Sequence, residues 1–171
     1  MKKRHIILSC VVVLFLILLG ASMFLLKQKQ DFKLSIADIP EFCLQQATDS
    51  LPFCNTQLAK GLPIVLMYLH PECEVCHTEA RQMQQKACNA ENIQWVLISY
   101  ANRDSLNKFA TIFHLHDIPR LTILMDSQLT LHSRLQVKSI PSCYIYNSQH
   151  QLVKVIQGMG RVEKIIQLAN R

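Results

Sequence analysis

Pro63–Met83 reads PIVLMYLHPECEVCHTEARQM, and the rest of the chain can be placed around it. The apolar run at 63–69 predicts a central strand covered on both faces, because it offers no polar position for a solvent-facing side. A short polar turn follows, and Cys73 and Cys76 then open a predicted helix. At this spacing both sulfurs lie on one side of the first helical turn, and the leading one faces free backbone N–H groups. The stretch therefore predicts a redox-active pair of thiols.

The remainder of the chain alternates between strand and helix patterns. Beyond the first strand, we expect helices at 74–88, 103–114 and 162–168, strands at 93–100, 121–125, 142–146 and 151–156, and a short helical or irregular piece at 127–135. The last two strands form a hairpin around a polar turn. This order predicts an α/β fold, a three-layer α/β/α sandwich with a mixed central sheet.

The N-terminus carries a predicted transmembrane helix. An uncharged run at 6–26 follows Lys2, Lys3 and Arg4. At about 1.5 Å per residue this run can cross a hydrocarbon layer of about 30 Å. The basic cluster before the run places the N-terminus in the cytoplasm and everything after Lys27 outside it, by the positive-inside rule.

A cleavable signal peptide is the alternative to an uncleaved signal-anchor. Gly20-Ala21-Ser22 could serve as its cleavage site, but the apolar stretch is longer than a usual signal core. We therefore expect residues 1–30 to be an anchor with a basic flank, joined by a polar link at 27–31. Residues 31–171 are expected to form one domain, of which 31–62 is a lead-in of short strands and turns.

Charge and cysteine content narrow the function classes. Most of the net charge of +6 comes from basic residues beside the apolar run, so no basic face for nucleic acid is implied. Seven cysteines are present, and an exported location permits disulfides. Cys43 and Cys54 could form a local disulfide or be two separately buried thiols. Cys88 and Cys143 are expected to be buried or idle thiols.

Three motifs in order resemble the thioredoxin fold: the Cys73–Cys76 pair after a strand, Ser139-Ile140-Pro141 before the hairpin, and Gly158 after it. More narrowly, residues 40–171 are similar to the membrane-anchored, thioredoxin-like thiol–disulfide oxidoreductases of bacteria, the TlpA/ResA kind. The resemblance implies a domain on the periplasmic or extracytoplasmic side of the bacterial inner membrane. It also implies protein thiol or disulfide substrates and an upstream redox partner.

The resemblance assigns roles to matching residues. Cys73 would be the attacking thiolate, and Cys76 the resolving thiol that breaks the mixed disulfide. Pro141 would be the cis-proline that keeps the backbone beside the sulfurs open for a substrate strand. Ile140 would contact that partner. No cofactor and no metal are expected.

The sequence also departs from the thioredoxin pattern. Met67 stands where thioredoxins carry a buried aspartate, and whether Glu72, Glu79 or His70 replaces that proton relay stays open. Glu72 and Glu74 flank Cys73, where we expect them to meet the substrate and to destabilise the thiolate. A less stable reduced form means a lower reduction potential, so we expect a reductant rather than a strong oxidant.

Rival functions use the same cysteines. Cys73 to His77 also satisfies the C-x-x-C-H signature of covalent haem attachment, and a copper or zinc carrier or a redox-inactive interaction module is a further alternative. The α/β pattern favours thiol chemistry over a small helical cytochrome. A purely structural bridge would constrain the unfolded chain very little. A peroxiredoxin would need threonine or serine at His70. His77 itself is expected to face solvent.

Overall fold

The structure, a computed structural model, describes residues 2–49 and 51–170. Helix α1 (Lys2–Ser35) forms one unit by itself, and a second unit begins at Ile36. The helix continues without a break through the residues at 27–31 that we expected to form a polar link. Its segment Val13–Asp31 is long and apolar enough to cross a membrane, by length and composition. The side chains at 2–4, on which the expected orientation rests, lie outside the described part, as do residues 1 and 171.

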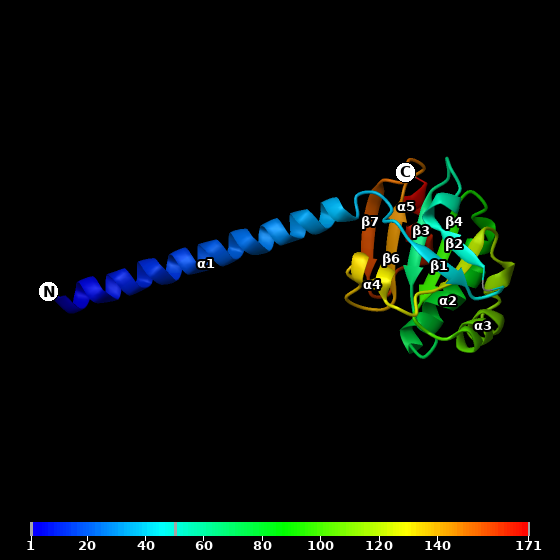
Figure 1. The fold of residues 1–171 in the computed structure, drawn as a ribbon, viewed down its shortest axis with the longest axis horizontal. Coiled ribbons are helices and arrows are strands. Elements are labelled where there is room, and N and C mark those ends of the chain that lie inside the picture. Colours follow the sequence, from blue (N-terminus) through cyan, green and yellow to red (C-terminus); the bar gives the residue numbers. More distant parts are fainter. Residues whose placement is uncertain (1, 50, 171) are drawn as a thin grey trace. The chain divides into compact units, whose positions relative to one another are not determined.

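A seven-stranded mixed sheet forms the centre of the second unit (Figure 1). Its spatial order is β2-β1-β5-β4-β3-β6-β7. The strands are β1 (Cys43–Gln46), β2 (Pro52–Cys54), β3 (Ile64–Tyr68), β4 (Gln94–Ser99), β5 (Leu121–Met125), β6 (Ser142–Tyr146) and β7 (Leu152–Gln157). β3, β4 and β5 run parallel, and every other pairing is antiparallel. All five residues of β3 are buried between its neighbours, which confirms the prediction of a central strand.

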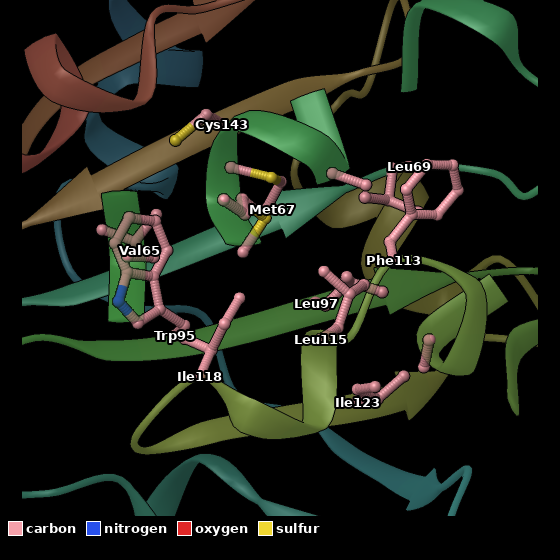
Figure 2. Close-up of a cluster of buried hydrophobic side chains, with 14 of the residues drawn as sticks. Val65, Met67, Leu69, Trp95, Leu97, Phe113, Leu115, Ile118, Ile123 and Cys143 are labelled. Carbon is pink, nitrogen blue, oxygen red and sulfur yellow. The ribbon is translucent and has the colours of Figure 1, made fainter. Parts of the chain in front are cut away.

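Helices cover both faces of this sheet. The helices are α2 (Glu74–Lys86), α3 (Arg103–Ile112), α4 (Thr130–Arg134) and α5 (Val162–Ala169), with short 3-10 turns at Asn55–Gln57, Ala87–Asn89 and Leu115–Asp117. Apolar residues of α2, α3 and α5 form one core cluster with alternate strand residues such as Val65, Met67 and Leu97 (Figure 2). On the opposite face, Tyr68 contacts His132 of α4. The three-layer α/β/α sandwich is therefore confirmed.

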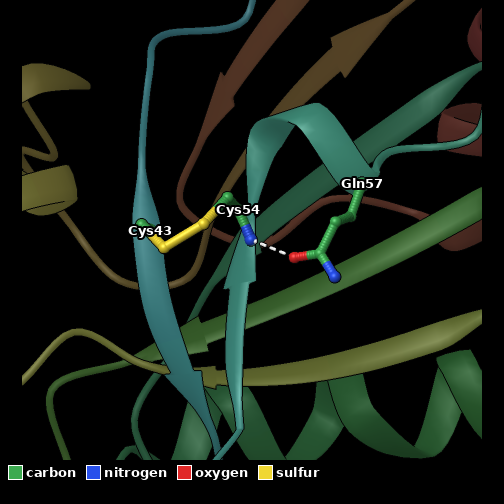
Figure 3. The surroundings of a disulfide bond; sticks show 3 residues. All are labelled: Cys43, Cys54 and Gln57. Carbon is green, nitrogen blue, oxygen red and sulfur yellow. Dashed lines mark hydrogen bonds between the residues drawn. A yellow bond between two sulfur atoms is a disulfide. The ribbon is translucent and has the colours of Figure 1, made fainter.

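A disulfide joins the two strands of the lead-in. Cys43 and Cys54 are directly opposite each other in the β1–β2 ladder and are bonded (Figure 3). The backbone N–H of Cys54 donates to the side-chain oxygen of Gln57 at 2.7 Å, at the point where β2 ends. Of the two alternatives that the sequence left open for these cysteines, the structure has the local disulfide.

Candidate active site

Cys73 begins helix α2. Its backbone is extended, and its sulfur accepts the N–H of Cys76 at 3.3 Å, so that it occupies the N-cap position usually held by an oxygen. The carbonyl of Cys73 accepts the first helical hydrogen bond, from the N–H of His77 at 3.1 Å. The side chain is half-buried and not bonded to another cysteine. Its sulfur therefore lies beside the free N–H groups at the start of the helix.

Cys76 differs sharply from Cys73 in its environment. Its side chain is fully buried beneath the first turn of α2. Burial, together with the hydrogen bond to Cys73, raises the pKa of the Cys76 thiol to about 12. One thiol is thus accessible at a helix start while the other is buried and protonated, which is the asymmetry expected of an attacking and a resolving cysteine.

Pro141 lies beside the leading sulfur. The Ile140–Pro141 peptide bond is cis, and the carbonyl oxygen of Ile140 is 3.9 Å from the sulfur of Cys73. Pro141 is buried and Ile140 half-buried. The N–H of Gly158 donates to the carbonyl of Pro141 at 2.8 Å, and Gly158 has a φ of +85°, which a residue with a side chain rarely adopts. The three sequence motifs therefore converge at one place in the fold.

Glu79 is the buried acid of the site. It follows Cys76 by three residues on α2 and is 1% exposed. Its side-chain oxygen accepts the N–H of Gly160 at 3.1 Å. Burial raises the pKa of Glu79 to about 7, partly offset by that hydrogen bond. The carboxyl also interacts electrostatically with the thiols of Cys76 and Cys143 and helps to raise the pKa of both.

The other two candidates for the proton relay lie elsewhere. Glu72 is exposed, as is Glu74, so both acids stand beside Cys73 at the surface. His70 is held by the turn itself: its Nδ1 accepts the N–H of Glu72 at 3.3 Å, and its ring stacks on Tyr100 with centroids 4.4 Å apart. Among the three, only Glu79 is a buried acid next to the resolving thiol.

The expectation that His77 faces solvent was wrong. Its Nε2 is 2.5 Å from the carbonyl oxygen of Pro71, and its ring packs on Phe109 and Phe113 of the α3 region, with centroids 5.8 and 5.3 Å away. The side chain is half-buried. His77 therefore braces the turn before Cys73 against α3, a contact between separate helices that the local sequence pattern does not reveal.

The remaining thiols play no visible part in the pair. Cys143 is buried on β6, and burial raises its pKa further above the usual range than that of Cys76. Cys88 is half-buried, and its thiol contacts the carbonyl of Gln84 at 2.9 Å. Within the described residues, no three side chains of His, Cys, Asp or Glu gather as a group that could hold a metal.

Sequence reasoning missed one buried charge near the site. Asp126 is 0% exposed, and its oxygens accept hydrogen bonds from the hydroxyl of Tyr68 and from the N–H groups of Thr130, Leu131 and His132. A signal was present: an aspartate that directly follows an apolar strand and precedes a short helix is placed to cap that helix. The hydrogen bond from Tyr68 has no such signal in the sequence, because Tyr68 lies 58 residues earlier in the chain.

A thiol pair at a helix start, beside a cis-proline that leads into a neighbouring strand of a mixed sheet, defines a thioredoxin-like oxidoreductase. The sequence model described as the AhpC/TSA family matches residues 37–155, more than half of the chain, and the protein belongs to this family. The resemblance to thioredoxin-like oxidoreductases of the TlpA/ResA kind is thereby confirmed at the level of family and fold. No curated protein sequence matches the chain.

Solved structures share the fold. A secreted Mycobacterium tuberculosis disulfide oxidoreductase, described as homologous to E. coli DsbE, has a TM-score of 0.65 and 22% identity, covering 76% of this chain and 96% of its own. StoA from Bacillus subtilis has a TM-score of 0.59 and 17% identity, covering 77% and 98%. The peroxidoxin BcpB from M. tuberculosis has a TM-score of 0.65 and 19% identity, covering 78% and 94%. At these identities the likeness concerns the fold.

Proposed function

We propose that this protein is an extracytoplasmic thiol–disulfide oxidoreductase that exchanges dithiol and disulfide with partner proteins through Cys73 and Cys76. The observation that carries the proposal is the position of the Cys73 sulfur, at the start of α2 and 3.9 Å from the Ile140 carbonyl beside cis-Pro141. An extended partner segment lying along Ile140 would bring its own disulfide to this sulfur.

The first step forms a mixed disulfide. The Cys73 thiolate attacks one sulfur of the partner's disulfide, and the other partner sulfur leaves as a thiolate and takes up a proton. The sulfur lies at the helix start, and the half-buried side chain leaves it accessible to a partner. The proposed contacts for the partner are Ile140, whose carbonyl oxygen is 3.9 Å from the sulfur, and the exposed chain neighbours Glu72 and Glu74.

The second step resolves the mixed disulfide. Cys76 gives its proton to Glu79 and attacks the Cys73 sulfur, so the partner's second thiolate leaves and a Cys73–Cys76 disulfide forms. The partner gains two electrons, and an upstream dithiol returns two electrons to this protein. Glu79 suits proton transfer because its pKa of about 7 leaves both protonation states populated near neutral pH.

A variant of Cys76 tests the function directly. In the full chain, Cys76→Ser should accumulate mixed disulfides on Cys73, visible as partner adducts on non-reducing gels that disappear with reductant. The matched control Cys73→Ser/Cys76→Ser keeps Cys88 and should form none of these adducts. Equal adducts in both variants, or none in either, would contradict exchange through this pair.

The direction of transfer is proposed to be reduction. The feature that supports this direction is the pair of exposed acidic side chains, Glu72 and Glu74, on either side of Cys73. We expect a reduction potential below about −200 mV when the protein is equilibrated in thiol–disulfide buffers. A value near about −120 mV, typical of strong periplasmic oxidants, would reverse the assignment.

Two of the rival functions have simple tests. Covalent haem would give the purified protein a sharp Soret band, whereas the proposed enzyme has no visible absorption. A peroxidase would consume hydrogen peroxide at the expense of its thiols, but His70 occupies the position that a peroxiredoxin needs for threonine or serine. We expect the protein to consume disulfide and to leave hydrogen peroxide largely untouched.

Helix α1 is proposed to anchor the domain in the inner membrane of a bacterium, with the domain on the periplasmic side. The side chains at 13–31 are exposed along the helix, as expected for a segment whose apolar surface is covered by lipid. Intact mass of the protein from membranes tests this proposal. The full chain should remain, and a mass that lacks the first twenty or so residues would indicate a cleaved signal peptide instead.

A further inference from the structure

Asp126 is a buried carboxylate that joins two parts of the chain. It lies directly after β5, and its Oδ1 accepts the N–H of Thr130 at 2.8 Å and that of Leu131 at 3.3 Å. Its Oδ2 accepts the N–H of His132 at 2.8 Å and the hydroxyl of Tyr68 at 2.9 Å. The carboxylate therefore holds the first turn of α4 and, through one more bond, the end of β3.

Tyr68 lies at the end of the strand that delivers the reactive sulfur. It is the last residue of β3, its ring is fully buried, and a turn of four residues separates it from Cys73. Burial and the neighbouring Asp126 raise the pKa of Tyr68 well above its usual range, so its hydroxyl remains a donor at all working pH values. Its ring also meets that of His132 edge-on, with centroids 5.3 Å apart.

Helix α4 leads to the other side of the active site. After the helix ends, the carbonyl of Leu135 accepts the hydroxyl of Tyr144 at 2.7 Å, and the N–H of Val137 donates to the carbonyl of His132 at 3.1 Å. The chain then reaches Ile140 and the cis-proline. Asp126 thus connects two segments: β3 with the turn after it, which leads to the Cys73 sulfur, and α4 with the loop after it, which leads to the Ile140 oxygen. These two atoms meet at the reaction centre.

We propose that the Tyr68–Asp126 hydrogen bond is a positioning device that sets the spacing between Cys73 and the Ile140–Pro141 edge on which a partner protein docks. The proposal rests on the exchange function proposed above and adds a determinant of its specificity. Tyr68 touches neither sulfur and acts only through the two segments. Its loss should therefore impair reactions that use both the sulfur and the edge, and spare reactions that need the sulfur alone.

The test compares a large and a small disulfide substrate. The full chain is purified in detergent, reduced, and mixed in single-turnover experiments with insulin or with oxidised glutathione. Tyr68→Phe keeps the ring and removes only the donor. Its rate with insulin should fall about tenfold through a higher KM, as expected for losing a buried hydrogen bond to a carboxylate, while the glutathione rate stays within about twofold.

Two further variants make the result specific. Tyr146→Phe is the matched control, because its buried hydroxyl has no hydrogen-bond partner within the described part of the chain and it lies at the far end of β6. It should change neither rate. Tyr144→Phe releases the same segment at Leu135 and should show the same selective loss. Unchanged rates in Tyr144→Phe would contradict control of the spacing through this segment, even if Tyr68→Phe is poorly folded.

The outcomes separate this inference from the function on which it rests. If the wild-type protein reduces neither insulin nor glutathione, the proposed exchange function itself is contradicted. An active wild type with an unchanged Tyr68→Phe variant, or with equal losses for insulin and glutathione, would overturn the positioning role alone.

Discussion

Replacing Glu79 with glutamine should alter how the stability of the protein depends on pH. In the folded protein the pKa of Glu79 is about 7, against 4.5 for an unperturbed carboxyl. Between these values the folded state holds a proton that the unfolded state releases. The free energy of unfolding that Glu79 contributes is therefore fully present below pH 4.5 and is lost as the pH rises through 7.

The magnitude follows from the size of the pKa shift. At about 1.4 kcal/mol per unit, the shift corresponds to about 3 kcal/mol of stability lost between acidic and mildly alkaline pH. Glu79→Gln cannot ionise, yet its amide oxygen can still accept the N–H of Gly160. The difference in unfolding free energy between the variant and the wild type should thus change by about 3 kcal/mol, in favour of the variant at high pH.

Urea unfolding of the full chain in detergent measures this difference between pH 4 and pH 8. Trp95 is the only tryptophan and is fully buried in β4, so its fluorescence reports unfolding of the domain. Glu91→Gln, a change at an exposed acid, is the control and should follow the wild-type curve. If the difference between Glu79→Gln and wild type stays flat across this range, within about 1 kcal/mol, the buried-acid argument fails.

Two other changes test the scaffold of the site. Cys43→Ser/Cys54→Ser opens a short covalent loop and should lower the unfolding free energy by about 3 kcal/mol, measured by urea unfolding without reductant. With reductant present throughout, the two proteins should unfold alike. His77→Ala removes the contact with Pro71 and a half-buried ring, and should cost about 1–2 kcal/mol and slow insulin reduction. The exposed His116→Ala should do neither, and an equal effect of the two histidine changes would contradict the bracing role of His77.

Much of the fold was predictable because its signals are local. The apolar run before Cys73 has no polar position and is therefore a buried strand, and the Cys73–Cys76 spacing places both thiols on the first turn of the next helix. Pro141 and Gly158 could be placed around the hairpin for the same reason. The burial of Glu79 was predictable as well, because Glu79 lies on the same inward face of α2 as Cys76.

Contacts between distant segments could not be predicted in this way. A strand pattern shows that Tyr68 is buried but not that its hydroxyl finds Asp126, because this depends on how β3 and β5 are brought together across β4. His77 likewise lies at a position of α2 that the sequence spacing predicts to be exposed. Its ring is covered only because the α3 region packs against it. The Cys43–Cys54 pairing depended on the register of two short strands, which the lead-in sequence does not specify.

The sulfur that reacts is also the atom that caps its own helix. Cys73 accepts the N–H of Cys76 when reduced, and a thiolate is a stronger acceptor than a sulfur that has entered a disulfide. Oxidation of Cys73 would therefore weaken this one capping bond, and reduction would restore it. In the exchange cycle proposed for this pair, the hydrogen bond that caps α2 is thus strongest while Cys73 is reduced.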